Sequence, residues 1–293
     1  MTRTARSTDV DEKDLPTRSL VIDGVRTPCI DAGAGEPIVF LHGYPESRLA
    51  WRHQLAALSA THRVFAADWP GWGDSERRLD VIPDYDLEVE RVGRLLDALE
   101  LESTNLVMHD YGGFTGLGFV TRHGRRVRRL AILNSRAQRT FPLFPWLLFG
   151  SIGVSARTPG LAALLERLPI GAMHRLLLHG YLRRGCFDRE RIDRYIGWMD
   201  TAEGRRWFRH FFVHYPLAVR PELAAALPRV ACPTSIIWGD SDPYNPMSIA
   251  EELAAKIPNS TLVRLAGADH FVMEERPAEV NEALLALLAR PAP

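Results

Sequence analysis

Asn105-Leu-Val-Met-His-Asp-Tyr-Gly-Gly113 is the stretch of this chain that decides its fold. An apolar run, typical of a buried strand, ends abruptly at Asp110 and two glycines follow it. A helical pattern then continues from Phe114 to Arg122. A strand, a sharp turn and a helix in direct succession are the setting of a nucleophile elbow. The alternative is an ordinary helix cap, because Asp is a favoured residue at that position.

Aspartate at the turn narrows the chemistry of such a site. A carboxylate that attacks an acyl carbon gives an anhydride, which is a poor intermediate for ester hydrolysis. A carboxylate that attacks a saturated carbon gives an alkyl ester, and a histidine-activated water can hydrolyse that ester while backbone N–H groups hold the oxyanion. An Asp110 nucleophile therefore indicates substrates with an electrophilic sp³ carbon, namely epoxides or carbon–halogen compounds.

Short apolar runs alternate with helical patterns along most of the chain. The later runs are continuous, as expected for strands that helices cover on both faces. The predicted strands are 18–22, 25–30, 37–41, 63–67, 104–108, 129–133, 234–238 and 261–265. The predicted helices are 49–58, 86–99, 113–122, 246–257 and 277–288. This alternation predicts an α/β fold with a mostly parallel eight-stranded sheet flanked by helices.

The alternation lapses after Ser135, where a segment rich in Leu, Arg and aromatic residues shows no clear strand. In open α/β sheets, ligands bind at the carboxyl ends of the strands. A helical insertion that leaves from such an end would cover the site as a cap. The predicted organisation is a flexible tail at 1–16, a core at 17–134 and 229–293, and a helical cap at 135–228.

Composition narrows the class of protein. The 293 residues are 46% hydrophobic and 25% charged, which is typical of a globular protein with one large core. Basic and acidic residues balance at 36 each, so neither nucleic acid nor a membrane is expected as a partner. The apolar run Phe141–Val154 contains prolines and is too short to span a bilayer.

The sequence also gives expectations for the cellular compartment and for bound cofactors. They rest on the cysteines, the glycines and the N-terminal residues. Cys29, Cys186 and Cys232 lack CxxC spacing, which argues against a zinc site or a disulfide framework and favours a cytoplasmic location. The N-terminus shows no apolar signal-peptide region. Gly33-Ala-Gly35 lacks the GxGxxG spacing of a dinucleotide site. We therefore expect no cofactor and no metal, and the oligomeric state stays open.

Two further polar residues follow predicted strands in the order nucleophile, acid, histidine, which is one of the known orders of a catalytic triad. Asp242 lies in a turn-rich loop after the strand that ends near Trp238, and His270 lies in a glycine-containing loop after the last strand. In this arrangement Asp242 orients His270, and His270 acts as the base. Asp240 is the rival acid, but Asp242 stands further into the loop.

The loop Leu41-His-Gly-Tyr-Pro-Glu-Ser47 follows another predicted strand and lies where an oxyanion-binding N–H is needed. We expect the backbone N–H groups of Tyr44 and Tyr111 to form the oxyanion hole. A tight turn before a helix is a common setting for a cis proline, so the Tyr44–Pro45 bond is a candidate. Ser47 is a plausible N-cap for the next helix.

Together these motifs resemble the α/β-hydrolase superfamily, and within it the branch of epoxide hydrolases and haloalkane dehalogenases. The resemblance extends from about Thr17 to the C-terminus. Asp242 and His270 match the acid and base positions of that branch. The other matching motifs are His42-Gly-Tyr-Pro-Glu-Ser47 (similar to HGxP), Asp68-Trp-Pro-Gly-Trp-Gly-Asp-Ser75 (similar to Gly-x-Gly-x-Ser) and His109-Asp-Tyr-Gly-Gly113 (similar to His-Asp-Trp-Gly-Gly).

The resemblance implies an α/β-hydrolase fold with a cap, and a small apolar or aromatic epoxide or halide substrate that is cleaved by water. Epoxide hydrolases carry two cap tyrosines that protonate the leaving oxygen, and Tyr215 lies late in the predicted cap where one is expected. Tyr181 and Tyr195 are candidates for the other, and no spacing selects between them, while Tyr111 is a further possible donor. His174 or His179 could replace a tyrosine as the donor.

Haloalkane dehalogenation with the same Asp110, His270 and Asp242 is the alternative function. Dehalogenases place Trp after the nucleophile and often Asn in the HGxP loop to hold the halide, whereas this chain has Tyr111 and Tyr44 there. A non-catalytic ligand-binding protein is a third reading, and the intact triad argues against it. The predicted contacts to substrate are Trp146 and Phe149 of an apolar cap, together with His109 and Asn134.

Overall fold

The computed structural model describes residues 15–137, 141–215 and 220–292. Most of the predicted tail at 1–16 lies outside the described residues. Eight strands form one sheet in the order β1-β2-β4-β3-β5-β6-β7-β8, and β2 runs antiparallel to β1 and β4 while all pairs from β4 to β8 are parallel. The strands are β1 Thr17–Ile22, β2 Val25–Ala32, β3 Pro37–Leu41, β4 Arg63–Ala67, β5 Thr104–His109, β6 Val127–Leu133, β7 Thr234–Gly239 and β8 Ser260–Leu265.

This topology confirms the predicted α/β sheet. Each predicted strand lies within two residues of an observed one at either end. Every residue of β5 and β7 is buried. Such strands are covered on both faces, which is why they read as continuous apolar runs instead of alternating ones.

Helices flank the sheet in two groups. α1, α11 and α12 pack together, and α12 also lies against β6 and β7. α2, α3 and α9 form the other group, with α3 packed on β5 and β6. The helices of these groups, with α10, are α1 Arg52–Leu58, α2 Tyr85–Ala98, α3 Asp110–His123, α9 Pro221–Ala226, α10 Met247–Lys256, α11 Val272–Glu275 and α12 Pro277–Leu288.

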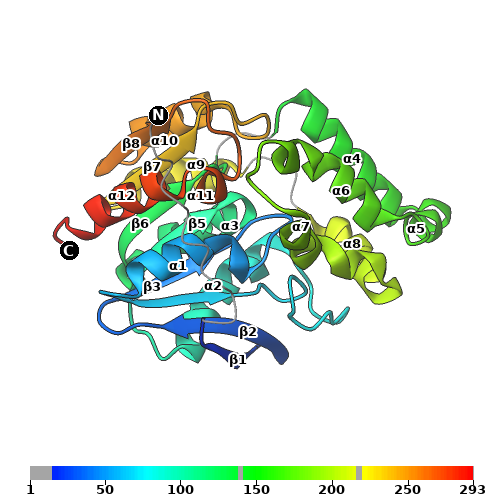
Figure 1. Cartoon of the computed structure of the whole chain (residues 1–293), viewed down its shortest axis with the longest axis horizontal. Helices are drawn as coiled ribbons and strands as arrows, with labels where there is room; N and C mark the ends of the chain where they lie inside the picture. Colours follow the sequence, from blue (N-terminus) through cyan, green and yellow to red (C-terminus); the bar gives the residue numbers. More distant parts are fainter. Residues whose placement is uncertain (1–14, 138–140, 216–219, 293) are drawn as a thin grey trace, which may run out of the picture.

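Five more helices lie between β6 and β7 in the sequence, and we call them the inserted helices. In Figure 1 they form a separate layer beside the core, on one side of the sheet. They are α4 Leu143–Arg157, α5 Pro159–Leu165, α6 Ile170–Arg183, α7 Arg189–Ile196 and α8 Ala202–His214. Within the described residues, no single helix is long and apolar enough to cross a membrane, and α4 and α5 reach that length only as a pair bent by 113°.

Close packing joins this layer to the core. Gly71, in the loop after β4, has a φ of +86°, and a Cβ there would overlap the Trp207 ring of α8 at 1.9 Å. Glu274 of α11 accepts hydrogen bonds from Tyr195 of α7 and from Arg52 of α1. The inserted helices therefore rest on loops at the carboxyl ends of the strands, which is the edge where the predicted site residues lie.

Candidate active site

Asp110 occupies a strained turn between β5 and α3. Its φ is +44°, in the left-handed region that non-glycine residues rarely adopt. The turn is tight because Gly112 and Gly113 allow close packing: a Cβ on Gly112 would lie 2.4 Å from the His42 carbonyl, and one on Gly113 would lie 2.4 Å from Ser135 Oγ. Strain held in place by the surrounding structure is typical of a functional position.

The two oxygens of Asp110 face different groups. Oδ2 accepts a hydrogen bond of 2.9 Å from the Tyr44 N–H, and it stands where the oxyanion of a tetrahedral intermediate would sit. Tyr111 follows in the first turn of α3, where backbone N–H groups have no intrahelical partner. Oδ1 lies 3.9 Å from His270 Nε2. The Tyr44–Pro45 bond is cis, as the turn predicted.

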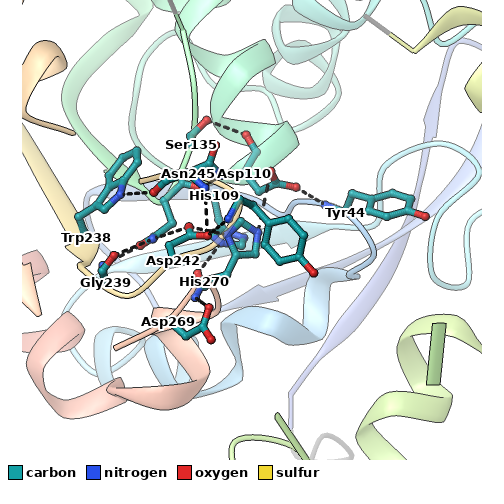
Figure 2. A network of polar contacts seen from close by, with 12 residues as sticks. Tyr44, His109, Asp110, Ser135, Trp238, Gly239, Asp242, Asn245, Asp269 and His270 are labelled. Carbon is teal, nitrogen blue, oxygen red and sulfur yellow. Dashed lines mark hydrogen bonds and ion pairs between the residues drawn. The ribbon is translucent and has the colours of Figure 1, made fainter. Parts of the chain in front are cut away.

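The structure brings His270 and Asp242 together (Figure 2). His270 Nδ1 lies 2.8 Å from Asp242 Oδ2, so Nε2 points toward Asp110. Asp242 Oδ1 accepts backbone N–H groups from Tyr244 and Asn245 at 2.7 and 3.0 Å. The carboxylate is thus fixed on both sides, and it fixes one orientation of the imidazole.

Neither Asp240 nor Asn134 has the role that the sequence suggested for it. The rival acid Asp240 accepts from Arg264 Nε at 2.7 Å and from the Gly267 N–H at 2.8 Å, on the outer side of the loop. Asn134 follows β6, and its amide nitrogen donates to Asp242 Oδ2 at 2.7 Å. Asn134 therefore supports the acid, which differs from the substrate contact that we expected of it.

Charge around His270 alters its titration. Burial opposes a charged imidazole, but the Asp242 carboxylate, its hydrogen bond and the Asp110 carboxylate outweigh burial and raise the pKa of His270 from 6.5 to about 9. In the ligand-free site at neutral pH, His270 is therefore an imidazolium between two carboxylates. Removing the charge of Asp110 removes one of the interactions that hold that proton.

A buried pair, His109 and Glu46, supports the loops around Asp110 and His270. His109 and Glu46 are both fully buried, and Nδ1 of His109 lies 3.1 Å from Glu46 Oε2. His109 Nε2 lies 3.0 Å from the His270 carbonyl, and Glu46 Oε2 also accepts the Gly43 N–H at 2.7 Å. His109 thus ties the elbow to the loops of Gly43 and His270, and it serves as a structural contact instead of the predicted substrate contact.

A family model described as the alpha/beta hydrolase fold matches residues 36–277. The chain belongs to the α/β-hydrolase family. Its relatives include epoxide hydrolase A of Mycobacterium tuberculosis, 31% identical over 93% of this chain and 97% of that protein, and a haloalkane dehalogenase of Sphingobium indicum, 28% identical over 92% and 94%. A solved structure of an alpha/beta hydrolase fold protein from Burkholderia ambifaria has a TM-score of 0.77 at 25% identity and covers 92% of this chain and 97% of that one.

These findings confirm the predicted fold and the branch of the family, and they show that this α/β-hydrolase is an enzyme. The relatives differ in the bond that their names say they cleave. The choice of substrate must therefore be argued from the side chains around Asp110.

An apolar cavity lies between the core of this α/β-hydrolase and the inserted helices. Asp110 and His270 lie at its core side, and three tyrosines, Tyr44, Tyr215 and Tyr244, line it with them. The other lining residues are Pro45, Phe141, Leu148, Phe149, Ile152, Leu165, Ile170, Met173, His174, Leu177, Leu178, Phe208 and Phe271. Tyr215 and Phe149 were predicted from the sequence to contact the substrate, whereas Tyr244 was missed although it lies only two residues after Asp242.

Tyr44 contributes its side chain as well as its N–H. Its hydroxyl lies 2.5 Å from His174 Nε2, on α6. His174 Nδ1 lies 2.8 Å from the Ile170 carbonyl, so Nδ1 carries the proton and Nε2 accepts from Tyr44 when the ring is neutral. Burial lowers the pKa of His174, which favours that neutral form. The sequence offered no spacing that pairs these two residues, because 130 positions separate them.

The other aromatic residues predicted to contact the substrate have side chains outside the lining of the cavity. Tyr181 donates its hydroxyl to Asp269 Oδ1 at 3.0 Å, and Tyr195 donates to Glu274. The Tyr111 ring stacks on Tyr215 with ring centres 5.8 Å apart, and neither Tyr111 nor Tyr181 is among the described residues that line the cavity. Trp146 is 42% exposed and, within the described chain, also lies outside that lining.

Carboxylate, imidazole and thiol groups do not gather into a metal site in the part of the chain that the structure describes. Cys29 and Cys232 are buried and unpaired as thiols, and burial raises the pKa of both. The polar side chains among the described residues that line the cavity are the Asp110 carboxylate, the imidazoles of His174 and His270, and the tyrosines Tyr44, Tyr215 and Tyr244.

Proposed function

We propose that this α/β-hydrolase is an epoxide hydrolase that converts a small apolar or aromatic epoxide and water into a diol, with a covalent ester on Asp110. One observation carries the proposal: three tyrosines, Tyr44, Tyr215 and Tyr244, line the same apolar cavity as Asp110 and His270. An epoxide oxygen leaves as an alkoxide, which is a poor leaving group unless an acid protonates it. Tyrosine hydroxyls supply that acid without adding charge to an apolar cavity.

The first step is attack by Asp110 Oδ1 on one ring carbon. A carbon–oxygen bond forms, the ring carbon–oxygen bond breaks, and its electron pair moves to the ring oxygen. Tyr215 donates its proton to that oxygen, and Tyr44 is the second hydroxyl within the same cavity. Burial raises the pKa of both phenols, so both are protonated before the ring opens.

The second step is hydrolysis of the ester. Esterification removes the negative charge of Asp110, so the pKa of His270 falls. His270 then releases its proton, which restores the Tyr215 hydroxyl, and the neutral imidazole can take a proton from water. Water attacks the Asp110 carboxyl carbon, and the Tyr44 N–H, already directed at Oδ2, stabilises the oxyanion with the Tyr111 N–H. Asp242 holds the imidazolium that results. The tetrahedral intermediate then breaks its bond to the diol oxygen, the acid proton of Asp110 passes to that oxygen, and Asp110 returns as a carboxylate.

The Tyr44–His174 contact adds an element to this scheme. In the ligand-free site the Tyr44 hydroxyl donates to neutral His174. When the substrate oxygen develops negative charge, the Tyr44 proton turns toward it, because an alkoxide is a stronger acceptor than an imidazole. His174 acts as a positioning residue that holds the Tyr44 hydroxyl in one orientation.

Heavy-oxygen water tests the covalent route. With enzyme in excess of an aromatic epoxide, the first turnover should release unlabelled diol and place the label in Asp110, because the new diol oxygen comes from the carboxylate. His270→Gln should accumulate Asp110 carrying the added mass of the epoxide, and Asp110→Asn should form neither ester nor diol. Label in the diol during the first turnover would show direct attack by water, and no diol across a broad epoxide panel would exclude epoxide hydrolysis.

Hydrolytic dehalogenation is the second candidate, because the relative named haloalkane dehalogenase aligns over most of the chain. The same Asp110 attack would expel a halide instead of an alkoxide. The described residues that line the cavity include neither Trp nor Asn to hold a halide, which favours the epoxide. Halide release from bromoalkanes without diol formation from epoxides would favour dehalogenation over epoxide hydrolysis.

A further inference from the structure

Two of the inserted helices present an apolar surface to the outside. α4 has fifteen residues, of which only Arg157 is charged. Its residues Leu143, Phe144 and Val154 are 72%, 73% and 61% exposed, and Leu176 of α6 is 77% exposed. A helix that faces water is normally polar on its outer side. We call the exposed apolar residues of α4 and α6 the outer apolar face.

This face is continuous with the cavity. Met173 and Leu177 of α6 line the cavity and are also about half exposed, at 47% and 49%. Leu148 and Ile152 of α4 line the cavity from the other helix. In the view of Figure 1, α4 and α6 both lie in the part of the inserted layer away from β1 and β2. Residues of both helices therefore line the cavity, and the half-exposed Met173 and Leu177 join its lining to the outer apolar face.

Charge on the chain is unevenly divided around this surface. Residues 141–215 contain eleven arginines, no lysine and six acidic residues, so the rest of the chain carries an equal acidic excess. From 141 to 184 there are five arginines and one acid, Glu166, which pairs with Arg209 of α8. Two of the five arginines are paired with acids from outside this range, Arg175 with Asp193 and Asp200 and Arg184 with Asp269. Arg157, Arg167 and Arg183 are exposed on α4 to α6. The balanced total of 36 and 36 conceals this separation.

We propose that the outer apolar face docks on an anionic lipid surface. Leu, Phe and Trp side chains on one side of a helix, with arginines beside them, are the composition of segments that lie in the interface of a bilayer. Anionic headgroups attract arginine, and the exposed apolar side chains enter the acyl boundary. This proposal departs from the expectation of no membrane partner, which rested on the net charge of the whole chain, because here a local surface makes the contact.

Docking would place the mouth of the cavity against the acyl layer. An apolar substrate dissolved in lipid could then reach Asp110 between α4 and α6 without crossing water. This second part rests on the proposed epoxide hydrolysis, whereas the docking itself does not.

A second copy of the chain fits the face less well. A two-fold dimer places the same patch on both subunits. The arginines of α4 to α6 would then meet arginines, and like charges at a dry interface are unfavourable. An anionic lipid surface satisfies both the apolar side chains and the arginines.

Vesicle flotation with the full chain tests docking. Wild-type protein should float with vesicles of phosphatidylcholine and phosphatidylserine, and at least tenfold less with phosphatidylcholine alone or in high salt. Phe144→Ser/Leu176→Ser should reduce flotation at least tenfold, because two large apolar groups no longer enter the lipid. The matched control is Leu285→Ser, a residue 48% exposed on α12 of the core, which should float like wild type.

Activity on a water-soluble epoxide separates the two proposals. The double variant should keep wild-type turnover of that substrate in solution and lose the acceleration on an epoxide carried in anionic vesicles. No flotation of wild type with either vesicle would overturn docking, and so would a dimer in sedimentation that Phe144→Ser/Leu176→Ser converts to monomer. Flotation without diol formation from any epoxide would leave docking supported and remove only the epoxide assignment.

Discussion

Replacing Asp110 by Asn should lower the pKa of His270 by about one to two units. Unit charges 3.9 Å apart, the separation of Asp110 Oδ1 and His270 Nε2, attract by about 4 kcal/mol at an effective dielectric constant of about 20. That energy corresponds to about three pKa units. The real charges are spread over a carboxylate and a ring whose centres lie further apart, so the shift is smaller. We expect His270 to titrate near 7 to 8 in place of about 9.

An NMR titration of protein labelled at the histidine rings measures this shift. The His270 signal is assigned by its absence from the spectrum of His270→Gln. Asn is close to Asp in size, so the variant keeps the side-chain volume at the elbow and removes only the charge. The same change occurs when Asp110 is esterified, so the titration reports the step that converts His270 from an imidazolium to a base.

Asp240→Asn is the matched control. It removes a carboxylate from the same loop as Asp242, but one that Arg264 and the Gly267 N–H hold away from the imidazole. The pKa of His270 should stay at its wild-type value. If His270 titrates in Asp110→Asn as it does in wild type, or shifts equally in Asp240→Asn, the electrostatic coupling of the two catalytic steps is refuted.

Three further outcomes follow from named contacts. Tyr215→Phe should slow ester formation by about 10²-fold in rapid-quench experiments, as loss of a general acid does; equal slowing of ester hydrolysis would contradict its role in ring opening. Tyr195→Phe should lower the free energy of unfolding in urea by about 1–3 kcal/mol, because Glu274 loses a buried donor, and an unchanged unfolding midpoint would count against that bond. The pKa of His270 is raised in the folded state, so its contribution to stability should be complete below about pH 6.5 and fall as pH rises to about 9. Urea unfolding across that range measures the slope, and Asp242→Asn should flatten it.

Much of the core was predictable from the sequence because strands and turns carry local signals. The run from Asn105 to His109 is apolar throughout and ends at a residue and two glycines that only a sharp turn accommodates. Asp242 and His270 follow strands in the same way. Parallel strands place their carboxyl ends on one edge, so residues far apart in the chain converge there without any long-range information.

The inserted helices were less predictable, since helical periodicity says which residues are buried but not what they are buried against. Tyr181, Tyr195 and Tyr215 all lie on buried positions, yet only Tyr215 lines the cavity, while the other two bind acids of the core. Trp146 was expected to face the substrate because it is aromatic, but it faces outward. Apolar composition alone does not distinguish an inward from an outward surface.

The buried pair of Glu46 and His109 has a consequence for how this site can change. It joins the elbow, the loop of Gly43 and the loop of His270 through contacts that are hidden from any ligand. A substitution in one of these loops disturbs the other two, so the three loops can change only together. The inserted helices contact these loops at separate points, because Tyr181 binds Asp269 next to His270 and His174 binds Tyr44. New substrate preferences should therefore be sought by diversifying the inserted helices at positions other than His174 and Tyr181, with the loops of the buried pair left unaltered.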